Sequence, residues 1–146
     1  MLVALGWKLQ GFDVTLQKHI RNSLGDEFEV DVVAIRGSEC KLLECKGRHA
    51  EYLESVDDLE RHFKLRCEAA SDEYGWDVCN LHQNVEAIYV TSGGASPDAA
   101  AYAARTTRSH KITCSFWDRS KLLGWLNDLG QPRLGEIIKK HYRTPD

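Results

Sequence analysis

The chain has 146 residues, enough for one domain with a hydrophobic core and too few for two domains of ordinary size. Hydrophobic residues make up 42% and charged residues 28%, which excludes a disordered chain, and no apolar run is long enough to span a bilayer. The net charge of −3 argues against a wholly basic protein that coats nucleic acid. The first residues do not fit a signal peptide, so we expect a cytoplasmic protein with no membrane partner.

The charges are distributed unevenly along the chain. Residues 1–104 carry 10 basic and 18 acidic side chains, a net charge of −8. Residues 105–143 carry nine basic and three acidic side chains, a net charge of +6. This split predicts an acidic site and a basic surface in one molecule, as in a protein that binds both metal and a polyanion. Ordinary unevenness of surface composition is the alternative.

The first third of the chain is predicted to form a helix and three strands. Leu2–Gln10 is predicted as a helix that ends at Gly11. Turn-forming residues at 22–26 and 36–39 then separate three β-type segments. We expect these strands over Asp13–Ile20, Glu27–Ile35 and Cys40–Lys46. Because the connections are short, the three strands should form an antiparallel meander.

Helical periodicity begins after the third strand. Apolar residues recur at intervals of three and four from Leu53 to Cys67, and Ser55 with Asp58 is typical of a helix N-terminus. The polar segment 72–84 is predicted as a loop. In chain order, the later elements are a strand over Val85–Thr91, a helix over Ala99–Arg108, a strand over Lys111–Trp117, a helix from Asp118 to about Asn127 and a helix over Arg133–Tyr142.

This order of elements predicts an α/β fold. Strands joined through helices run parallel by right-handed crossovers. The sheet should therefore be mixed, with an antiparallel three-strand meander followed by parallel strands and with helices on both faces. We expect one domain over residues 1–146, with its core at about 10–127 and a C-terminal helical extension at 128–146.

The second and third strands carry the residues that point to chemistry. If these strands fold about residues 36–39, residues whose numbers add up to 75 lie opposite each other. Asp31 then lies opposite Glu44, and Glu29 lies opposite Lys46. Period-two alternation places all four on one sheet face, which becomes apolar toward the turn.

Apposed carboxylates in apolar surroundings repel each other, and a divalent cation relieves that repulsion. Lys46 could then contact both an attacking water and a phosphate oxygen, so the set predicts metal-assisted phosphodiester hydrolysis. A second Glu-x-Lys copy, at Glu39 and Lys41, has no acid opposite and is interpreted as solvated surface in a turn. An exposed cross-strand pair of Glu29 and Lys46 is the structural alternative.

Asp31, twelve intervening residues and then Glu44-Cys45-Lys46 resemble the PD-(D/E)XK, or restriction-endonuclease-like, nucleases. The two strands are similar to those of resolvase-like and Mrr-like members and of nuclease domains from CRISPR ancillary effectors. The resemblance covers about residues 10–127. It implies that Asp31, Glu44 and the Cys45 carbonyl bind Mg²⁺ or Mn²⁺ and that Lys46 assists the nucleophile.

The chain departs from the family pattern in two places. Val30 stands where the family name has proline, as in many members. Many members also carry a glutamate on a helix before the first strand, whereas no acidic residue precedes Asp13 here. The chain is therefore a piece of a longer protein, or that role is missing or filled by Glu29. Gln17 and His19 on the first strand are further auxiliary candidates.

The resemblance and the charge pattern together predict a nuclease that acts on DNA, with endonuclease action favoured. The alternatives are a non-catalytic nucleic-acid-binding or assembly module on the same fold, and an RNA-cleaving effector domain of a larger protein. We expect a homodimer or an additional N-terminal domain to share in binding. Predicted nucleic-acid contacts are Arg48, Arg105, Arg108, Arg119 and Lys121. Arg61, Lys64 and Arg66 could also hold phosphates, but the favoured interpretation is that they are solvated helix charges.

The five cysteines are odd in number and irregularly spaced, which indicates reduced, buried thiols. A loose metal-like pattern joins His62, Cys67, Cys79 and His82. It lacks the paired CxxC knuckles of structural zinc sites, so zinc is kept only as an alternative.

Overall fold

The computed structural model describes residues 2–71, 84–109 and 113–141, without the side chains of residues 65, 67–71, 107–109, 138 and 141. Its centre is a five-stranded sheet in the order β1-β2-β3-β5-β7. The first three strands are antiparallel, and the pairs β3/β5 and β5/β7 are parallel. The strands are β1 (Asp13–Arg21), β2 (Glu27–Arg36), β3 (Glu39–Lys46), β5 (Asn84–Thr91) and β7 (Thr113–Trp117). The predicted mixed sheet is confirmed.

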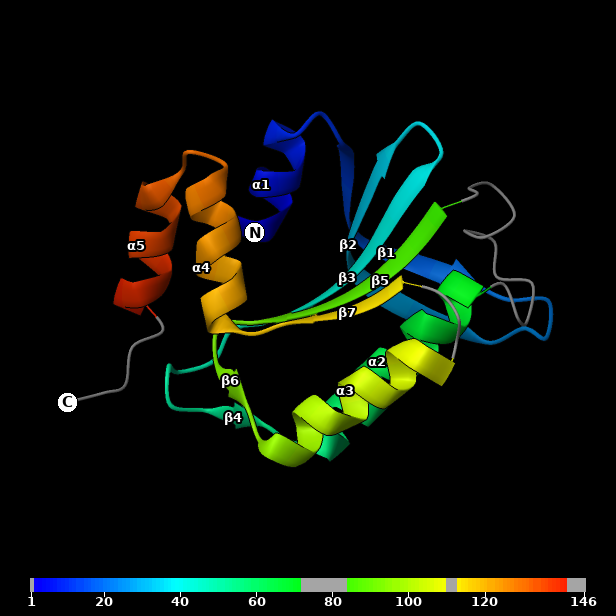
Figure 1. Cartoon of the computed structure of the whole chain (residues 1–146). Coiled ribbons are helices and arrows are strands. Elements are labelled where there is room, and N and C mark those ends of the chain that lie inside the picture. The colour runs from blue at the N-terminus through cyan, green and yellow to red at the C-terminus, as the bar shows by residue number, and fades with distance from the viewer. Residues whose placement is uncertain (1, 72–83, 110–112, 142–146) are drawn as a thin grey trace.

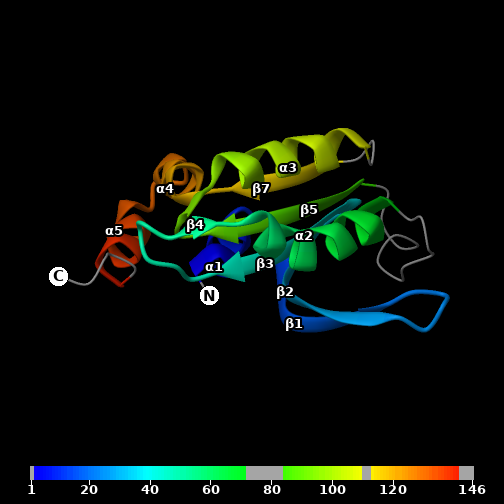
Figure 2. The ribbon, with the colours of Figure 1, turned by 90° about the horizontal axis from the view of Figure 1, so that it is seen from below.

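Helices cover both faces of this sheet (Figures 1 and 2). One face carries α1 (Leu2–Leu9), α4 (Arg119–Asp128) and α5 (Pro132–His141), and the other carries α2 (Val56–Ser71) and α3 (Pro97–Ser109). A parallel two-stranded ribbon of β4 (Leu53–Glu54) and β6 (Gly94–Ala95) was not predicted. Within the described ranges, no helix combines the length and apolarity needed to cross a membrane.

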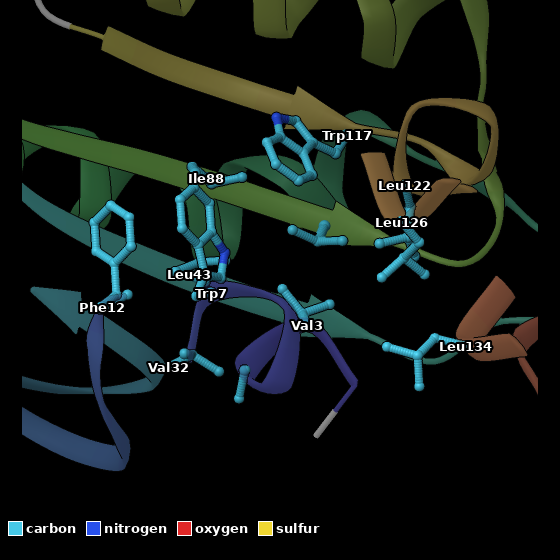
Figure 3. Packing of buried hydrophobic residues seen from close by; sticks show 13 residues of the cluster. Val3, Trp7, Phe12, Val32, Leu43, Ile88, Trp117, Leu122, Leu126 and Leu134 are labelled. Carbon is cyan, nitrogen blue, oxygen red and sulfur yellow. The ribbon is translucent and has the colours of Figure 1, made fainter. Parts of the chain in front are cut away.

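The core beneath α1 is built around Trp7, as Figure 3 shows. Its ring meets Phe12 edge-on at 5.0 Å between centroids and stacks on Trp117 at 6.1 Å. Gly6 permits the Trp125 ring to approach α1 closely, because a β-carbon at Gly6 would lie 2.3 Å from that ring. Leu134 of α5 joins the same cluster, so α5 packs onto the core.

The opposite face is covered by α2, whose start follows the predicted pattern. The Ser55 hydroxyl accepts the Asp58 N–H at 3.2 Å, and the Asp58 carboxylate accepts the Ser55 N–H at 2.9 Å, a reciprocal capping box. From this start, α2 places Leu59 and Phe63 against the sheet, where the Phe63 ring meets Tyr89 edge-on. The cap and the apolar stripe therefore set how α2 lies over β3 and β5.

The predicted register of β2 and β3 is confirmed. Val33 pairs with Leu42 and Ile35 pairs with Cys40, so opposed residue numbers add up to 75. Val33, Cys40 and Leu42 form one buried cluster on the α2 face. The register therefore brings Asp31 and Glu44 to the same level just beyond the last ladder pair, Val32 and Leu43.

Candidate active site

Asp31 connects β2 to β3 through its side chain. Its Oδ2 accepts the backbone N–H of Cys45 at 2.9 Å. This bond follows directly on the Val32/Leu43 pair, where the regular ladder between the two strands ends. Within the described ranges, the other oxygen of Asp31 accepts no hydrogen bond. Asp31 is thus positioned by the sheet and keeps an oxygen for a ligand.

Glu44 is a buried carboxylate held by two cations. Its side chain is 4% exposed; Oε1 lies 2.7 Å from Lys46 Nζ and Oε2 lies 2.6 Å from Arg66 Nη2. Burial raises the pKa of Glu44, Arg66 and Lys46 oppose that rise, and the charge of Asp31 adds to it. The protein's own cations therefore provide the counter-charge that we expected from a metal.

Arg66 is almost fully buried, so the interpretation of it as a solvated helix charge is wrong. Besides Glu44, its Nη2 binds the carbonyl of Glu29 at 2.7 Å and its Nη1 binds the carbonyl of His62 at 2.6 Å. Its guanidinium carbon lies 5.0 Å from the centroid of the Phe28 ring. Burial lowers the pKa of Arg66, against the charges of Glu44 and Asp31. Arg66 therefore joins α2, β2 and β3 behind the carboxylate.

His62 adds an imidazole to the same group. Its Nδ1 lies 3.4 Å from Glu44 Oε1, and its side chain is 31% exposed. Burial, together with the positive charges of Lys46 and Arg66, lowers the pKa of His62 to about 4. The ring is therefore neutral near pH 7 and can accept a hydrogen bond.

The helical spacing of α2 carries a sequence signal for His62 and Arg66. Leu59 and Phe63 lie on the buried stripe of α2, and the same helical spacing places Arg66 seven residues and His62 three residues after Leu59. Two charged or titratable residues on an apolar stripe require partners in the core. Which partners they meet depends on the docking of α2, which the pattern does not give.

Glu29 does not share the face of Glu44, so that part of the face prediction is wrong. Its neighbour Phe28 packs on the α2 side, and Glu29 instead lies 3.5 Å from His19. The physical reason is an irregularity at Gln17, whose φ is 51°. The strand alternation changes phase there: Val30 and Val33, although three residues apart, belong to the same buried cluster.

Gln17 and His19 are also placed by this irregularity. Gln17 is exposed on β1, between the pairs Leu16/Val32 and Lys18/Val30 that flank Asp31. His19 binds Glu27 at 2.7 Å and lies on the exposed side of the hairpin with Glu29. The structure therefore brings Gln17 to the level of Asp31 and directs His19 away from Glu44.

The second Glu-x-Lys copy is not the solvated turn that we expected. Lys41 lies inside β3, opposite Ala34 on one side and Glu86 on the other. Its side chain is 17% exposed, lies 3.8 Å from the Glu86 carboxylate and faces the Trp7 ring at 5.9 Å. Lys41 is therefore a largely buried ion-pair partner on the α1 face, opposite to the face of Glu44.

The donor set at Asp31 and Glu44 is limited but suits a hard cation. In the described part of the chain, no three His, Cys, Asp or Glu residues gather as a metal-binding group. Mg²⁺ is commonly held by one or two carboxylates while water and substrate phosphate fill the other positions. The free oxygen of Asp31, the Glu44 carboxylate and the adjacent Cys45 carbonyl fit that preference.

The zinc alternative rests largely outside the described residues. Cys79, His82 and the Cys67 side chain are not described, and His62 is engaged with Glu44. Cys40, Cys45 and Cys114 carry reduced thiols, as predicted. Burial raises the pKa of Cys45 to about 12, so this thiol next to Glu44 stays protonated.

The predicted nucleic-acid contacts whose side chains the structure describes do not form one patch. Arg105 is exposed in the second half of α3, which runs away from the carboxyl end of β5, and the side chain of Arg108 is not described (Figure 1). Arg119 lies at the start of α4, where its Nη1 binds the carbonyl of Ser92 at 2.9 Å. Lys121 lies 5.3 Å from the centroid of the Trp117 ring.

Arg48 lies two residues beyond Lys46 and binds a carboxylate that the sequence analysis did not single out. Its Nε lies 3.2 Å from Oε1 of Glu54, which is fully buried. Glu54 also accepts the hydroxyls of Thr91 at 2.8 Å and Tyr89 at 3.2 Å. Glu54 lies directly before the predicted helix start at Ser55, and nothing in its spacing marks it as buried.

Comparisons with known proteins support the fold. No protein-family model and no curated protein sequence matches the chain. Among solved structures, the crystal structure of AF1548, a protein of unknown function, is similar with a TM-score of 0.54 and 19% identity, over 84% of this chain and 62% of that one. The restriction endonuclease MspJI, in complex with a 27-mer oligonucleotide, matches with a TM-score of 0.46 and 15% identity. That match covers 99% of this chain and 32% of MspJI, so the chain spans less than two thirds of either protein.

Proposed function

We propose that the protein is a metal-dependent nuclease that hydrolyses phosphodiester bonds of DNA, with endonuclease action favoured. The observation that carries the proposal is the meeting of Asp31, Glu44 and Lys46 at the carboxyl end of β3, with His62 beside them. A buried carboxylate with a raised pKa next to a lysine and a neutral imidazole is typical of catalytic sites. The residue pattern of the PD-(D/E)XK nucleases supports the same conclusion.

Each residue has a distinct role in this proposal. Asp31, Glu44 and the Cys45 carbonyl would hold Mg²⁺ or Mn²⁺, which when bound supplies a Lewis acid for the phosphate. Lys46, 25% exposed and fixed by Glu44, would place its ammonium beside the phosphate oxygens and the attacking water. His62 is neutral and would accept a hydrogen bond from that water and orient it. If its Nδ1 proton faces Glu44, its Nε2 is the acceptor.

A non-catalytic nucleic-acid-binding module is the second candidate, and one observation favours it. Both oxygens of Glu44 are already engaged by cations of the protein, Lys46 on Oε1 and Arg66 on Oε2. Because these cations already neutralise the carboxylate, the fold needs no metal at Glu44. In the nuclease, Glu44 must instead share its oxygens between these cations and the metal.

The deciding experiment is incubation with single-stranded, duplex and branched DNA and with RNA, each with Mg²⁺, Mn²⁺ or a chelator. The nuclease proposal expects cleavage that the chelator abolishes and that Glu44→Gln removes. Binding without cleavage under every metal condition would favour the non-catalytic module. Cleavage of RNA alone would favour the effector domain and would refute DNA as the substrate.

A further inference from the structure

A second group of charged residues lies beside the candidate active site and is organised by the turn after β5. Ser92 is buried there; its N–H donates to the carbonyl of Lys46 at 3.0 Å. Its hydroxyl accepts the N–H of Arg48 at 2.6 Å and donates to the Arg48 carbonyl at 2.8 Å. Its own carbonyl accepts from Arg119 Nη1 at 2.9 Å. One serine therefore gathers Lys46, Arg48 and Arg119 at the carboxyl ends of β3 and β5.

The side chain of Arg48 is fixed as firmly as its backbone. The buried Glu54 carboxylate binds its Nε at 3.2 Å, and its guanidinium carbon lies 4.5 Å from the centroid of the Tyr52 ring. The Tyr52 hydroxyl in turn donates to Asp58 at 2.9 Å, within the capping box of α2. Arg48 is 31% exposed in its side chain, so a fixed guanidinium reaches the surface.

Arg48 keeps the donors that a phosphate would need. Its Nε binds Glu54, and within the described ranges its Nη1 and Nη2 nitrogens make no hydrogen bond. A planar guanidinium with two terminal donors matches the oxygens of a phosphate. The loop that carries it is tightly packed, since a β-carbon at Gly93 would lie 2.6 Å from the Tyr52 carbonyl oxygen. The geometry therefore holds a phosphate ligand group ready before the ligand arrives.

We propose that Arg48 forms a phosphate subsite for nucleic acid, flanking the cleavage position at Lys46, and that Glu54 and Tyr52 are positioning residues for it. This inference rests on the proposed function, which identifies the polymer as nucleic acid. It extends that function by naming the residue that binds the phosphate backbone. The contact is to a phosphodiester, so duplex DNA and duplex RNA share its chemistry. Arg119, on the same serine, lies next to this subsite.

The role of Glu54 determines whether the variant Glu54→Gln binds nucleic acid more tightly or more weakly than the wild type. If Glu54 acted only through its charge, Glu54→Gln would remove a negative charge near the ligand and tighten binding of nucleic acid. If Glu54 positions Arg48, the same change weakens binding. Both carboxylate oxygens of Glu54 accept hydrogen bonds, from Arg48, Thr91 and Tyr89, whereas a glutamine has one accepting oxygen and one donating nitrogen. A purely structural role would change stability and leave the salt dependence of binding unchanged.

The test is fluorescence anisotropy with a labelled DNA duplex and the matching RNA duplex, in chelator, across a salt series. Arg48→Met should weaken binding roughly tenfold, as expected for a lost charge-assisted bond. It should also reduce the slope of log affinity against log salt by about 0.9, the value for one phosphate contact on duplex DNA. Glu54→Gln should weaken binding at least about threefold, and the double variant should bind like Arg48→Met, because positioned pairs are not additive.

Arg21→Ala is the matched control, since Arg21 is also paired with a glutamate, Glu27, but at the far end of the β1–β2 hairpin. It should retain the wild-type slope. An equal loss in Arg21→Ala, tighter binding by Glu54→Gln, or a wild-type slope in Arg48→Met would each overturn the subsite. If Glu54→Gln does not fold, Tyr52→Leu replaces it, because Tyr52 is 37% exposed; weaker binding supports the subsite and wild-type binding refutes it.

The outcome also separates this inference from the nuclease proposal. Binding in chelator requires no cleavage, so a reduced slope in Arg48→Met would support the subsite even if no substrate is cut. Cleavage by a protein whose Arg48→Met variant keeps the wild-type slope would support the nuclease and refute the subsite. A wild-type protein that binds neither duplex would refute the subsite, and the cleavage assay with metal would still decide the nuclease proposal.

Discussion

Replacing Arg66 by methionine tests the buried ion pair behind the candidate site. The variant leaves Glu44, with a 4% exposed side chain, without the partner that lies 2.6 Å from its Oε2. Breaking one side of a buried pair typically costs about 3–5 kcal/mol, because the remaining carboxylate stays desolvated and here keeps only Lys46 as a counter-charge. The bonds from Arg66 to the carbonyls of Glu29 and His62 are lost as well. We therefore expect Arg66→Met to lower the free energy of unfolding by about 3–5 kcal/mol near pH 7.

A double-mutant cycle isolates the charge from the packing. In a Glu44→Gln background Arg66 has no carboxylate partner, so Arg66→Met should cost at most the two carbonyl bonds, about 1–2 kcal/mol in total. The expected coupling is therefore about 2 kcal/mol, measured by urea unfolding of the four proteins at constant pH. Acidification should also reduce the cost of Arg66→Met in the Glu44 protein, because protonation neutralises the isolated carboxylate. An equal cost in both backgrounds would refute the ion-pair reasoning.

Three further changes test the site. Lys46→Ala should reduce cleavage by about 100-fold or more while nucleic-acid binding persists, whereas the exposed Lys64→Ala should cleave normally; the reverse result would place the catalytic lysine elsewhere. Asp31→Asn should abolish Mg²⁺ or Mn²⁺ binding in calorimetry yet change stability by less than about 1 kcal/mol, because the amide oxygen can still accept the Cys45 N–H; retained metal binding would exclude Asp31 as a ligand. Because the pKa of His62 is lowered from 6.5 to about 4, the unfolded chain binds a proton between these two pH values that the folded chain does not bind. Stability should therefore fall from pH 6.5 toward pH 4 by up to about 3 kcal/mol, and His62→Gln should flatten that dependence in chemical unfolding; an unchanged profile would contradict the assignment.

The catalytic candidates could be predicted from the sequence because their relation is local. The turn between β2 and β3 is short, so it determines the register of the two strands, and Val33/Leu42 and Ile35/Cys40 pair as expected. Apolar alternation then gave the buried face on the turn side of Asp31. The capping box of Ser55 and Asp58 was likewise predictable, because it depends on residues three apart.

A local irregularity at Gln17 of β1 overrides the strand alternation at Glu29. Glu29 was expected beside Lys46, but the alternation changes phase between Asp31 and Val30, across from Gln17. A residue such as Gln17 carries no sequence signal for a positive φ. Beyond that point the hairpin directs Glu29 to His19 and leaves Phe28 facing Arg66.

By itself, the sequence determined the order of the elements, the register of β2 and β3, and the meeting of Asp31, Glu44 and Lys46. These follow from side-chain periodicity and turn length, which act over a few residues. The tertiary structure alone decided that Arg66 and Glu54 are buried and which groups they bind. Their partners lie 22 and 37 residues away in the chain, so their meeting depends on how α2 and the β4–β6 ribbon dock onto the sheet. A buried charge is tolerated only where docking supplies its partner, and no local pattern encodes that position.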